Sequence, residues 1–246
     1  MTVHRSVANL RASSVACPHR ADSRCEECKV RASSVCAALR SDELAELEAI
    51  AHQVSFAAKE SLFLESDKAR DVFNITSGVV RLYRLFRDGR RQVIGFSFPG
   101  DFLGVQLSTD HGFSADAVSD VSVCRFAKRD FEALLARKPL LMEALHGRAA
   151  TIMRLMQDQV VSLGRRSAEE RMAWFITQLR ERTALGGAEG SVSIPMSRQD
   201  IADYLGLTIE TVSRTLSALA KRGVISVEPG GVRVLKEGLI GELAAG

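Results

Sequence analysis

The sequence predicts an α+β fold: an N-terminal antiparallel β-roll of the cupin or jelly-roll type, a long dimerisation helix, and a C-terminal winged helix-turn-helix. Three observations predict it. Short alternating apolar runs separated by glycine turns occupy the chain from about Val54 to Phe126. An extended helical period follows over Leu140–Leu163. Two short helical segments joined by a glycine, with a hairpin after them, lie near the C-terminus.

The composition is that of a globular protein large enough for two domains. The chain has 246 residues, of which 46% are hydrophobic and 26% charged, and its formal net charge is +3. No apolar run approaches the roughly 20 residues that span a bilayer, and the N-terminus lacks an apolar signal-peptide stretch. We therefore expect a cytoplasmic protein without a membrane partner. Four segments are expected: a Cys-rich segment 1–40, a β-roll sensor domain 41–137, a dimerisation helix 138–164 and a winged helix-turn-helix domain 165–246.

The cysteines in the first segment indicate a metal or cluster site. The chain has five cysteines, and an odd number without a secretion signal argues against a disulfide framework. Cys25 and Cys28 form a C-x2-C pair, and Cys36 follows after seven residues. A fourth thiolate would come from Cys17 or Cys124. Four thiolates suit either tetrahedral zinc or a [4Fe–4S] cluster, and the spacing does not choose between them.

The β-roll prediction rests on repeated turn signals between strand-like runs. These signals are Ser77-Gly78, Asp88-Gly89, Pro99-Gly100-Asp101 and His111-Gly112. Short strands separated by such turns are typical of an antiparallel roll or barrel.

The long helix is predicted to pair with a second copy of the chain. Lys128–Arg137 forms a short helix first, and Pro139 suits the first turn of the next one. The long helix would extend roughly 36 Å. Its heptad-like seam consists of Leu141, Leu145, Ile152 and Leu155, with Gln159 as an imperfect member. Such a seam pairs with its own copy or packs on the adjacent β domain. Asp158 lies beside the seam, where like charges from two chains would repel.

The helix-turn-helix is predicted from capping and turn residues. Ser197 begins the first helix with S-x-x-D, a relative of the capping box. Gly206 lies where a tight turn needs a positive φ, and Thr208 suits the N-cap of the second helix. Val224–Glu228 and Val232–Leu235 flank a Pro-Gly-Gly turn, and this hairpin adds the wing.

The second helix is expected to read double-stranded DNA. Glu210, Ser213 and Arg214 lie in its first two turns, which reach base edges in such motifs. Arg214 can donate two hydrogen bonds to guanine, and Glu210 can accept from cytosine, each worth roughly 1–3 kcal/mol of discrimination. The alternative for Glu210 and Arg214 is an i,i+4 salt bridge. The candidate contacts to the phosphate backbone are Ser197, Thr208, Thr211 and Arg233.

The order of parts resembles the cyclic-AMP receptor protein superfamily, and within it the oxygen-sensing FNR (fumarate and nitrate reduction) regulators. The resemblance covers nearly the whole chain. It is densest in Ser167–Phe175, Gly95–Gly104 and Ser197–Leu216. The E-x-x-S-R signature of FNR recognition helices stands here as Glu210, Ser213 and Arg214. It implies a homodimer on an inverted repeat of TTGAT-like half-sites.

The same resemblance implies a cofactor and partners. An oxygen-labile [4Fe–4S] cluster would be held by Cys25, Cys28, Cys36 and Cys124, with Cys17 outside the pattern. An acid near the seam, here Asp158, would keep the cluster-free protein monomeric. RNA polymerase would touch the loop Phe86–Arg91. Cyclic AMP is not expected as a ligand, because the stretch after Gly104 lacks the phosphate-gripping arginine and offers Asp116 instead.

Three other functions compete with this interpretation. A regulator of the same fold could respond to another input: haem, nitric oxide or structural zinc. The five histidines show no ligand-like grouping for haem. A non-regulatory, zinc-stabilised module is the second, and elemental analysis separates it from the cluster protein. An enzyme is not expected, because the sequence has no nucleophile elbow, P-loop, H-E-x-x-H or Rossmann fingerprint.

Overall fold

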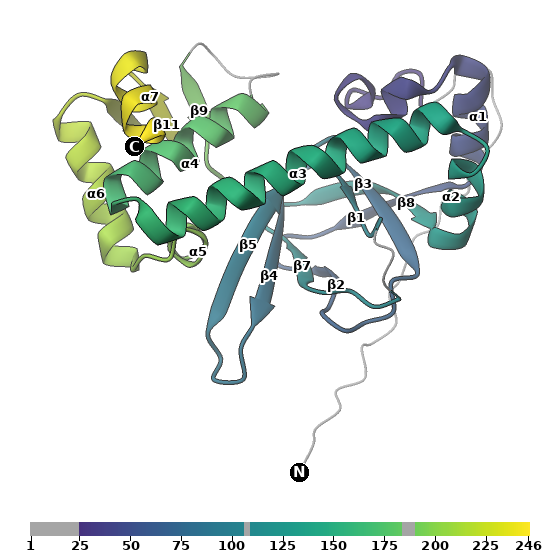
Figure 1. The fold of residues 1–246 in the computed structure, drawn as a ribbon, viewed down its shortest axis with the longest axis horizontal. Helices are drawn as coiled ribbons and strands as arrows, with labels where there is room; N and C mark the ends of the chain where they lie inside the picture. Colours follow the sequence, from purple (N-terminus) through teal and green to yellow (C-terminus); the bar gives the residue numbers. More distant parts are fainter. Residues whose placement is uncertain (1–24, 106–108, 184–189) are drawn as a thin grey trace.

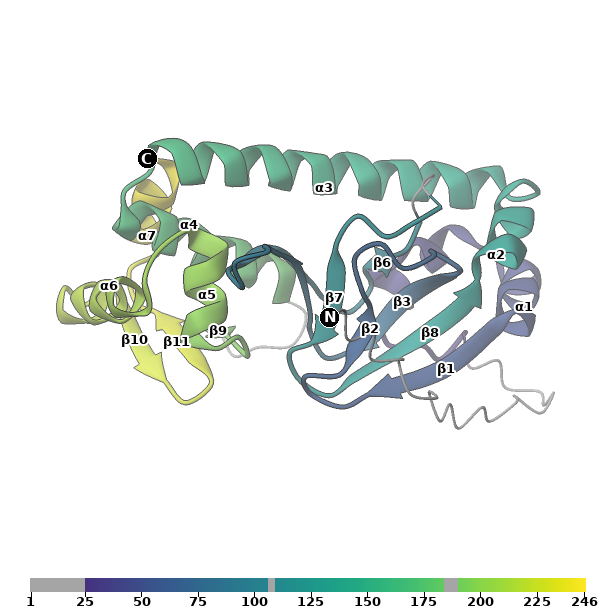
Figure 2. The same ribbon diagram turned by 90° about the horizontal axis from the view of Figure 1, so that it is seen from below.

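The fold was described from a computed structural model, in which residues 25–105, 109–183 and 190–246 are placed. Cys17, most of segment 1–40 and most of the loop after residue 183 lie outside the described residues. A β domain occupies one end of the molecule and a helical domain the other, and one long helix runs past both (Figures 1 and 2). This arrangement confirms the predicted fold class.

The β-roll consists of two four-stranded antiparallel sheets. Their strand orders are β1-β8-β3-β6 and β2-β7-β4-β5. The strands are β1 Ala51–Phe56, β2 Ser61–Phe63, β3 Asp71–Ser77, β4 Val80–Leu85, β5 Arg91–Ser97, β6 Phe102–Leu103, β7 Ser114–Ala117 and β8 Val121–Ala127. Apolar side chains from both sheets, among them Phe56, Ile75, Val80, Leu103 and Val121, form a core between them.

Short helices cover one end of the roll. They are the 3-10 helices η1 Arg31–Ser33 and η2 Val35–Ala38, and the α-helices α1 Ser41–Ala49 and α2 Lys128–Leu135. Leu44 and Leu47 of α1 pack with Phe131 of α2 and Leu141 of the long helix in a second buried cluster. Cys36 is buried in the same cluster. The N-terminal cysteine segment is therefore packed directly against the start of the long helix.

The long helix α3 spans Pro139–Arg165 and has three different environments along its length. Leu141 and Leu145 are buried in the chain's own sensor domain. Gln159 is buried at the other end, where its side chain donates a hydrogen bond of 2.6 Å to the carbonyl oxygen of Tyr204. These three residues are therefore not free for a second chain, which corrects the predicted seam for them. Leu141 and Leu145 pack on the β domain, the alternative left open by the sequence, whereas Gln159 is bonded to the helix-turn-helix.

Several apolar side chains in the middle and second half of α3 face solvent, some of them in the predicted seam and some beside it. Ile152 is exposed and Leu155 is half-buried, and Asp158 is exposed beside them. Met153, Met156 and Val160 are also exposed, with Val160 at 70%. The spacing of 153, 156 and 160 places these three on one side of the helix.

The C-terminal domain is a winged helix with two additions. Its elements are α4 Ala168–Thr183, β9 Ser191–Ser193, α5 Arg198–Leu205, α6 Ile209–Lys221, β10 Ile225–Glu228, β11 Gly231–Val234 and α7 Glu237–Ala245. The hairpin β10–β11 is the predicted wing, and β9 adds a third strand to it. The helix α7, which packs on α4, was not predicted.

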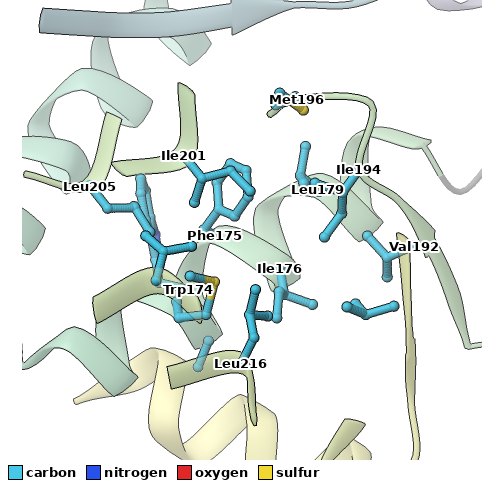
Figure 3. Close-up of a cluster of buried hydrophobic side chains, with 14 of the residues drawn as sticks. Trp174, Phe175, Ile176, Leu179, Val192, Ile194, Met196, Ile201, Leu205 and Leu216 are labelled. Carbon is cyan, nitrogen blue, oxygen red and sulfur yellow. The ribbon is translucent and has the colours of Figure 1, made fainter. Parts of the chain in front are cut away.

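One hydrophobic core joins the C-terminal domain to the β-roll. Figure 3 shows its central part, with Trp174, Phe175 and Ile176 of α4 packed against Ile201, Leu205 and Leu216 of the helix-turn-helix. Val79, Val93, Phe96 and Phe98 of the β-roll belong to the same buried cluster. The residues before and after the expected division at residues 164 and 165 therefore share one hydrophobic core.

Candidate nucleic-acid interface and cysteine cluster

Helix α5 begins and ends as its sequence predicts. Ser197 is the N-cap, and its hydroxyl accepts from the Asp200 backbone N–H at 3.1 Å. The Asp200 carboxylate accepts in return from the Ser197 backbone N–H, also at 3.1 Å, which completes the capping box. Gly206 ends the helix in the left-handed region, with φ of 62°. A Cβ added there would lie 3.0 Å from Leu163 of α3, so the turn packs closely on the long helix.

Helix α6 has one buried face and one exposed face. The hydroxyl of Thr208 accepts from the Thr211 backbone N–H at 3.2 Å and caps its start. Val212, Leu216 and Leu219 are buried in the core. The face opposite the core carries the three predicted base-reading residues, all exposed: Glu210, Ser213 and Arg214.

The Glu210 and Arg214 side chains are not bonded directly, although the charge of Arg214 acts on Glu210. No ion pair joins them in the part of the chain that the structure describes. The guanidinium of Arg214 makes a hydrogen bond of 3.5 Å to the Thr211 hydroxyl. The pKa of Glu210 is lowered, first by its own backbone N–H, then by the Thr208 hydroxyl and last by the charge of Arg214, as expected for a carboxylate at a helix N-terminus. The exposed face thus presents a cation with one long hydrogen bond and an anion whose carboxylate is hydrogen-bonded at the start of its own helix.

The four candidates for backbone contact differ in their surroundings. Ser197 and Thr208 are exposed at the starts of α5 and α6, and Thr211 is half-buried. Arg233 of the wing pairs with Glu228 at 2.7 Å. A phosphate contact by Arg233 would therefore compete with this ion pair.

The structure places Asp116 in an ion pair that sequence reasoning missed. Asp116 is buried on β7, and Arg81 lies directly opposite it on β4. The two side chains form a bidentate pair with bonds of 3.0 and 2.6 Å. The only sequence signal for it would have been the pairing register of two strands that are not consecutive in the chain.

The cysteines predicted as ligands gather at one end of the β-roll. Cys36 is buried, Cys25, Cys28 and Cys124 are half-buried, and none of these four is in a disulfide. Cys25 and Cys124 pack against the buried cluster that contains Cys36. Burial raises the pKa of Cys25 to about 12, and the charges of Glu48, Cys124, Cys36 and Cys28 act in the same direction. The thiol of Cys25 therefore lies within electrostatic reach of the other three cysteines.

Polar side chains surround the Cys36 sulfur inside this cluster. The hydroxyl of Ser34 donates to it at 3.4 Å, and the side-chain amide of Asn74 donates at 3.9 Å. Asn74 is buried on β3 and lies directly opposite Cys124 of β8. Burial raises the pKa of Cys36, and the hydrogen bond from Ser34 partly offsets it. Cys36 and Cys124 are thus brought near one another through Asn74.

These side chains do not form an assembled metal site. Across residues 25–105, 109–183 and 190–246, no group of three or more His, Cys, Asp or Glu side chains is arranged to hold a metal ion. The donor type nevertheless suits a group that takes thiolates, since Cys25, Cys36 and Cys124 belong to one cluster.

One further surface bears on the predicted partners. Phe86 begins the loop Phe86–Arg91, which is predicted to touch RNA polymerase, and it is exposed to solvent; Leu85, the last residue of β4, is exposed beside it. Among the described helices, none is long and apolar enough to cross a membrane.

Comparison with known proteins identifies both halves of the chain. A model of the Crp-like helix-turn-helix domain matches residues 170–239, and a model of the cyclic nucleotide-binding domain matches residues 53–138. The solved structure of FixK2 from Bradyrhizobium japonicum superposes with a TM-score of 0.75 at 33% identity, and covers 80% of this chain and 98% of that one.

Curated relatives cover nearly the full length. The nitrogen fixation regulation protein FixK of Bradyrhizobium diazoefficiens is 47% identical over 90% of this chain and 94% of its own length. The transcriptional activatory protein AadR of Rhodopseudomonas palustris is 45% identical with the same coverage. An anaerobic regulatory protein of Haemophilus influenzae is 31% identical over 83% of this chain and 81% of its own length.

Proposed function

The chain belongs to the Crp/FNR family of transcription regulators, and from that premise we propose that it responds to oxygen and binds an inverted repeat of TTGAT-like half-sites as a homodimer. The relatives are regulators and not enzymes, which excludes the non-regulatory alternatives. The observation that carries the operator proposal is the exposed face of α6, where Glu210, Ser213 and Arg214 stand in the order of the FNR signature. Support for oxygen comes from the relative named as an anaerobic regulatory protein.

The homodimer is proposed to form along the middle and end of α3. Ile152, Met153, Met156 and Val160 are exposed there, with Leu155 half-buried among them. Apolar side chains at such spacing on a long helix can be buried against the same helix of a second chain. Asp158 is exposed beside them, so two Asp158 carboxylates would approach each other in the dimer. Their repulsion opposes association and makes the dimer sensitive to small changes elsewhere.

The proposed oxygen-sensing group is a [4Fe–4S] cluster held by Cys25, Cys28, Cys36 and Cys124. When bound, it would supply an oxygen-labile link between the N-terminal segment and β8. The protein supplies the coupling to DNA binding. Cys36 and Leu141 share one buried cluster, so the position of the cysteine segment affects the packing of α3. The helix then carries that change toward the dimer contact and the helix-turn-helix.

We propose further that cyclic AMP is not the ligand of the β-roll. The only guanidinium bonded to Asp116 in the described residues, that of Arg81, is already occupied by carboxylates. In the region that follows Gly104, the His111 ring stacks on Phe63 of β2 with ring centroids 3.7 Å apart, and Phe113 contacts the same phenyl ring at a tilt. RNA polymerase is the proposed partner of the loop Phe86–Arg91, where the Phe86 side chain is exposed.

Anaerobic purification tests the sensing proposal. Wild-type protein should be brown, contain about four irons and four sulfides per chain, and bind a TTGAT palindrome more tightly than air-exposed protein. Cys28→Ala should be colourless and should bind the palindrome weakly with or without air. Cys17→Ala is the matched control, because Cys17 lies outside the proposed ligand set, and it should behave as wild type.

Two outcomes would contradict the proposal at different points. A colourless anaerobic preparation that contains zinc would remove oxygen sensing through a cluster but leave the regulator intact. A wild-type protein that selects a different palindrome from a random DNA pool would overturn the TTGAT assignment and leave the sensing chemistry untouched.

A further inference from the structure

We propose that Arg81 of the β-roll is a positioning residue for DNA recognition. It fixes α5, and through α5 the recognition helix α6, in one orientation relative to the sensor domain. The inference rests on the proposed dimeric binding to two half-sites, because orientation matters most when two recognition helices must engage DNA together. It concerns a residue far from the reading face, on a different domain.

Arg81 bridges the two domains with its whole guanidinium group. Its Nε and Nη2 atoms donate to the two oxygens of Asp116, at 3.0 and 2.6 Å. Its remaining nitrogen, Nη1, donates to the Oδ1 atom of Asp200 on α5. The side chains are largely buried, with exposures of 14% for Arg81, 10% for Asp116 and 6% for Asp200. A planar guanidinium that binds two carboxylates in this way permits little rotation of either one.

Asp200 divides its two oxygens between the helix and the sensor domain. Oδ2 accepts from the backbone N–H and the hydroxyl of Ser197, at 3.1 and 2.7 Å, and so caps α5. Oδ1 accepts from Arg81 and, at 2.7 Å, from Arg91. The first turn of α5 is thereby attached to the β4–β5 hairpin through the same carboxylate that starts the helix.

A second set of bonds holds the next turn of α5. Arg91 donates to the Asp203 carboxylate at 2.7 and 2.8 Å, and the side-chain amide of Gln92 donates to the Asp203 carbonyl at 2.6 Å. Arg81 and Arg91 also lie over the Tyr83 ring, 5.5 and 5.9 Å from its centroid. Two arginines from neighbouring strands therefore form ion pairs with two successive turns of one helix.

The consequences reach α6 because α5 and α6 move together. The tight turn at Gly206 joins them, and both contribute buried residues to the core in Figure 3. Glu210, Ser213 and Arg214 are exposed while the ion-pair network is closed. The closed network therefore presents the reading face and does not cover it. In a dimer, it would fix the separation of two reading faces, which must lie about 34–36 Å apart to enter successive major grooves.

Removing Arg81 leaves two buried carboxylates with fewer cationic partners. Asp116 and Asp200 both take hydrogen bonds from this one residue. Removing one partner of a buried ion pair strongly destabilises the folded protein, because the other charge stays buried without its partner; the loss of a surface pair has a much smaller effect. The contact between α5 and the sheet should then open, and the winged helix should gain freedom relative to the sensor domain.

The test compares Arg81→Met with Arg84→Met. Arg84 lies on the same strand, but it is exposed and pairs with Glu65 inside the sensor domain, so its loss removes the same charge without touching α5. Affinity is measured for three DNAs derived from an operator that wild type selects from a random pool: the palindrome, one half-site alone, and palindromes with one or two base pairs inserted between half-sites. Arg81→Lys is included because it keeps the charge beside Asp116 yet cannot bridge two carboxylates bidentately.

We expect Arg81→Met to bind the single half-site within about twofold of wild type and to lose at least about tenfold on the palindrome. Two linked recognition sites raise the affinity for DNA roughly 10²–10⁴-fold over a single site. A winged helix that moves relative to the β-roll loses part of this increase. The variant should also discriminate less against inserted base pairs. Arg81→Lys should be intermediate, and Arg84→Met should match wild type on all three DNAs.

Several results would overturn the inference. Equal losses on half-site and palindrome would show a merely structural role for Arg81, and an unchanged palindrome affinity would show no role. A gain in affinity would show that the network restrains binding. If wild type itself gained nothing from a second half-site, the dimeric function and this inference would both be wrong. If wild type does bind the palindrome more tightly than the half-site, but the Arg81 variants do not show the expected loss, only this inference is wrong and the proposed function is unaffected.

Discussion

At the scale of single residues, Arg214 and Arg81 show how differently two arginines can serve one recognition surface. Arg214 is exposed, holds a single weak hydrogen bond to Thr211, and has its guanidinium available to DNA. The side chain of Arg81 is 14% exposed, and each of its three guanidinium nitrogens donates a hydrogen bond within the protein. The capping residues of α5 and α6 and the turn at Gly206 could be predicted from the sequence because each depends only on neighbours in the chain. The Arg81–Asp200 contact could not, because its partners are 119 positions apart.

Arg214→Ala should lower affinity for the selected operator by about 1–3 kcal/mol and relax selectivity at one guanine of each half-site. The measurement is a titration against the operator and against versions that carry each base change. Lys221→Ala, at the exposed end of the same helix, is the control and should keep the wild-type ranking of base changes. Arg214→Ala with an unchanged ranking would show that another residue reads the guanine.

At the scale of elements, α3 combines three tasks that its sequence pattern alone does not separate. Its first turns complete the sensor core, its exposed middle carries the proposed dimer contact, and its end is bonded to α5. Periodicity predicted the helix and its length well. It could not assign the faces, because an apolar side chain covered by its own domain and one covered by a second chain produce the same pattern.

Leu141→Ala and Val160→Lys should separate two of these tasks. Leu141 is fully buried, so its truncation should reduce the free energy of unfolding by about 2–5 kcal/mol. Val160 is 70% exposed, so a lysine there should leave the stability of the single chain nearly unchanged and weaken dimerisation. Chemical denaturation and sedimentation at several concentrations provide the two readouts. A Val160→Lys protein that dimerises like wild type would place the interface elsewhere.

The missed elements have their own physical reasons. Helix α7 contains Gly238 and Gly241, and glycine disfavours helix, so local propensity argued against it. It forms because Ile240 and Ala244 are buried in the core shared with α4. Strand β9 has only three residues, Ser191–Ser193, and exists through its pairing with β11. Tertiary packing decided both, and single-sequence patterns do not report it.

At the scale of the whole molecule, the sensor and the winged helix should unfold as one cooperative unit. Their shared core contains residues from both domains, and the Arg81 and Arg91 network joins the same surfaces. Trp174 is the chain's single tryptophan and is buried in that core, so its fluorescence reports on the winged helix. Its transition in denaturant should coincide with that of far-ultraviolet circular dichroism, which reports on both domains. Two separate transitions would show that the domains are thermodynamically independent.

The shared core also has an evolutionary consequence. Val79, Val93, Phe96 and Phe98 of the β-roll pack among the winged-helix residues, so the surface between the domains is not an interchangeable face. Consider a recombination event at the end of the long helix that joins this C-terminal domain to the β-roll of a distant relative. The apolar residues that the two domains contribute to the shared core would then not have evolved together. Exchange of sensors is therefore favoured only between chains whose β4–β5 hairpins have co-evolved with compatible α4 and α5 helices, which restricts how freely new inputs can be acquired by domain shuffling.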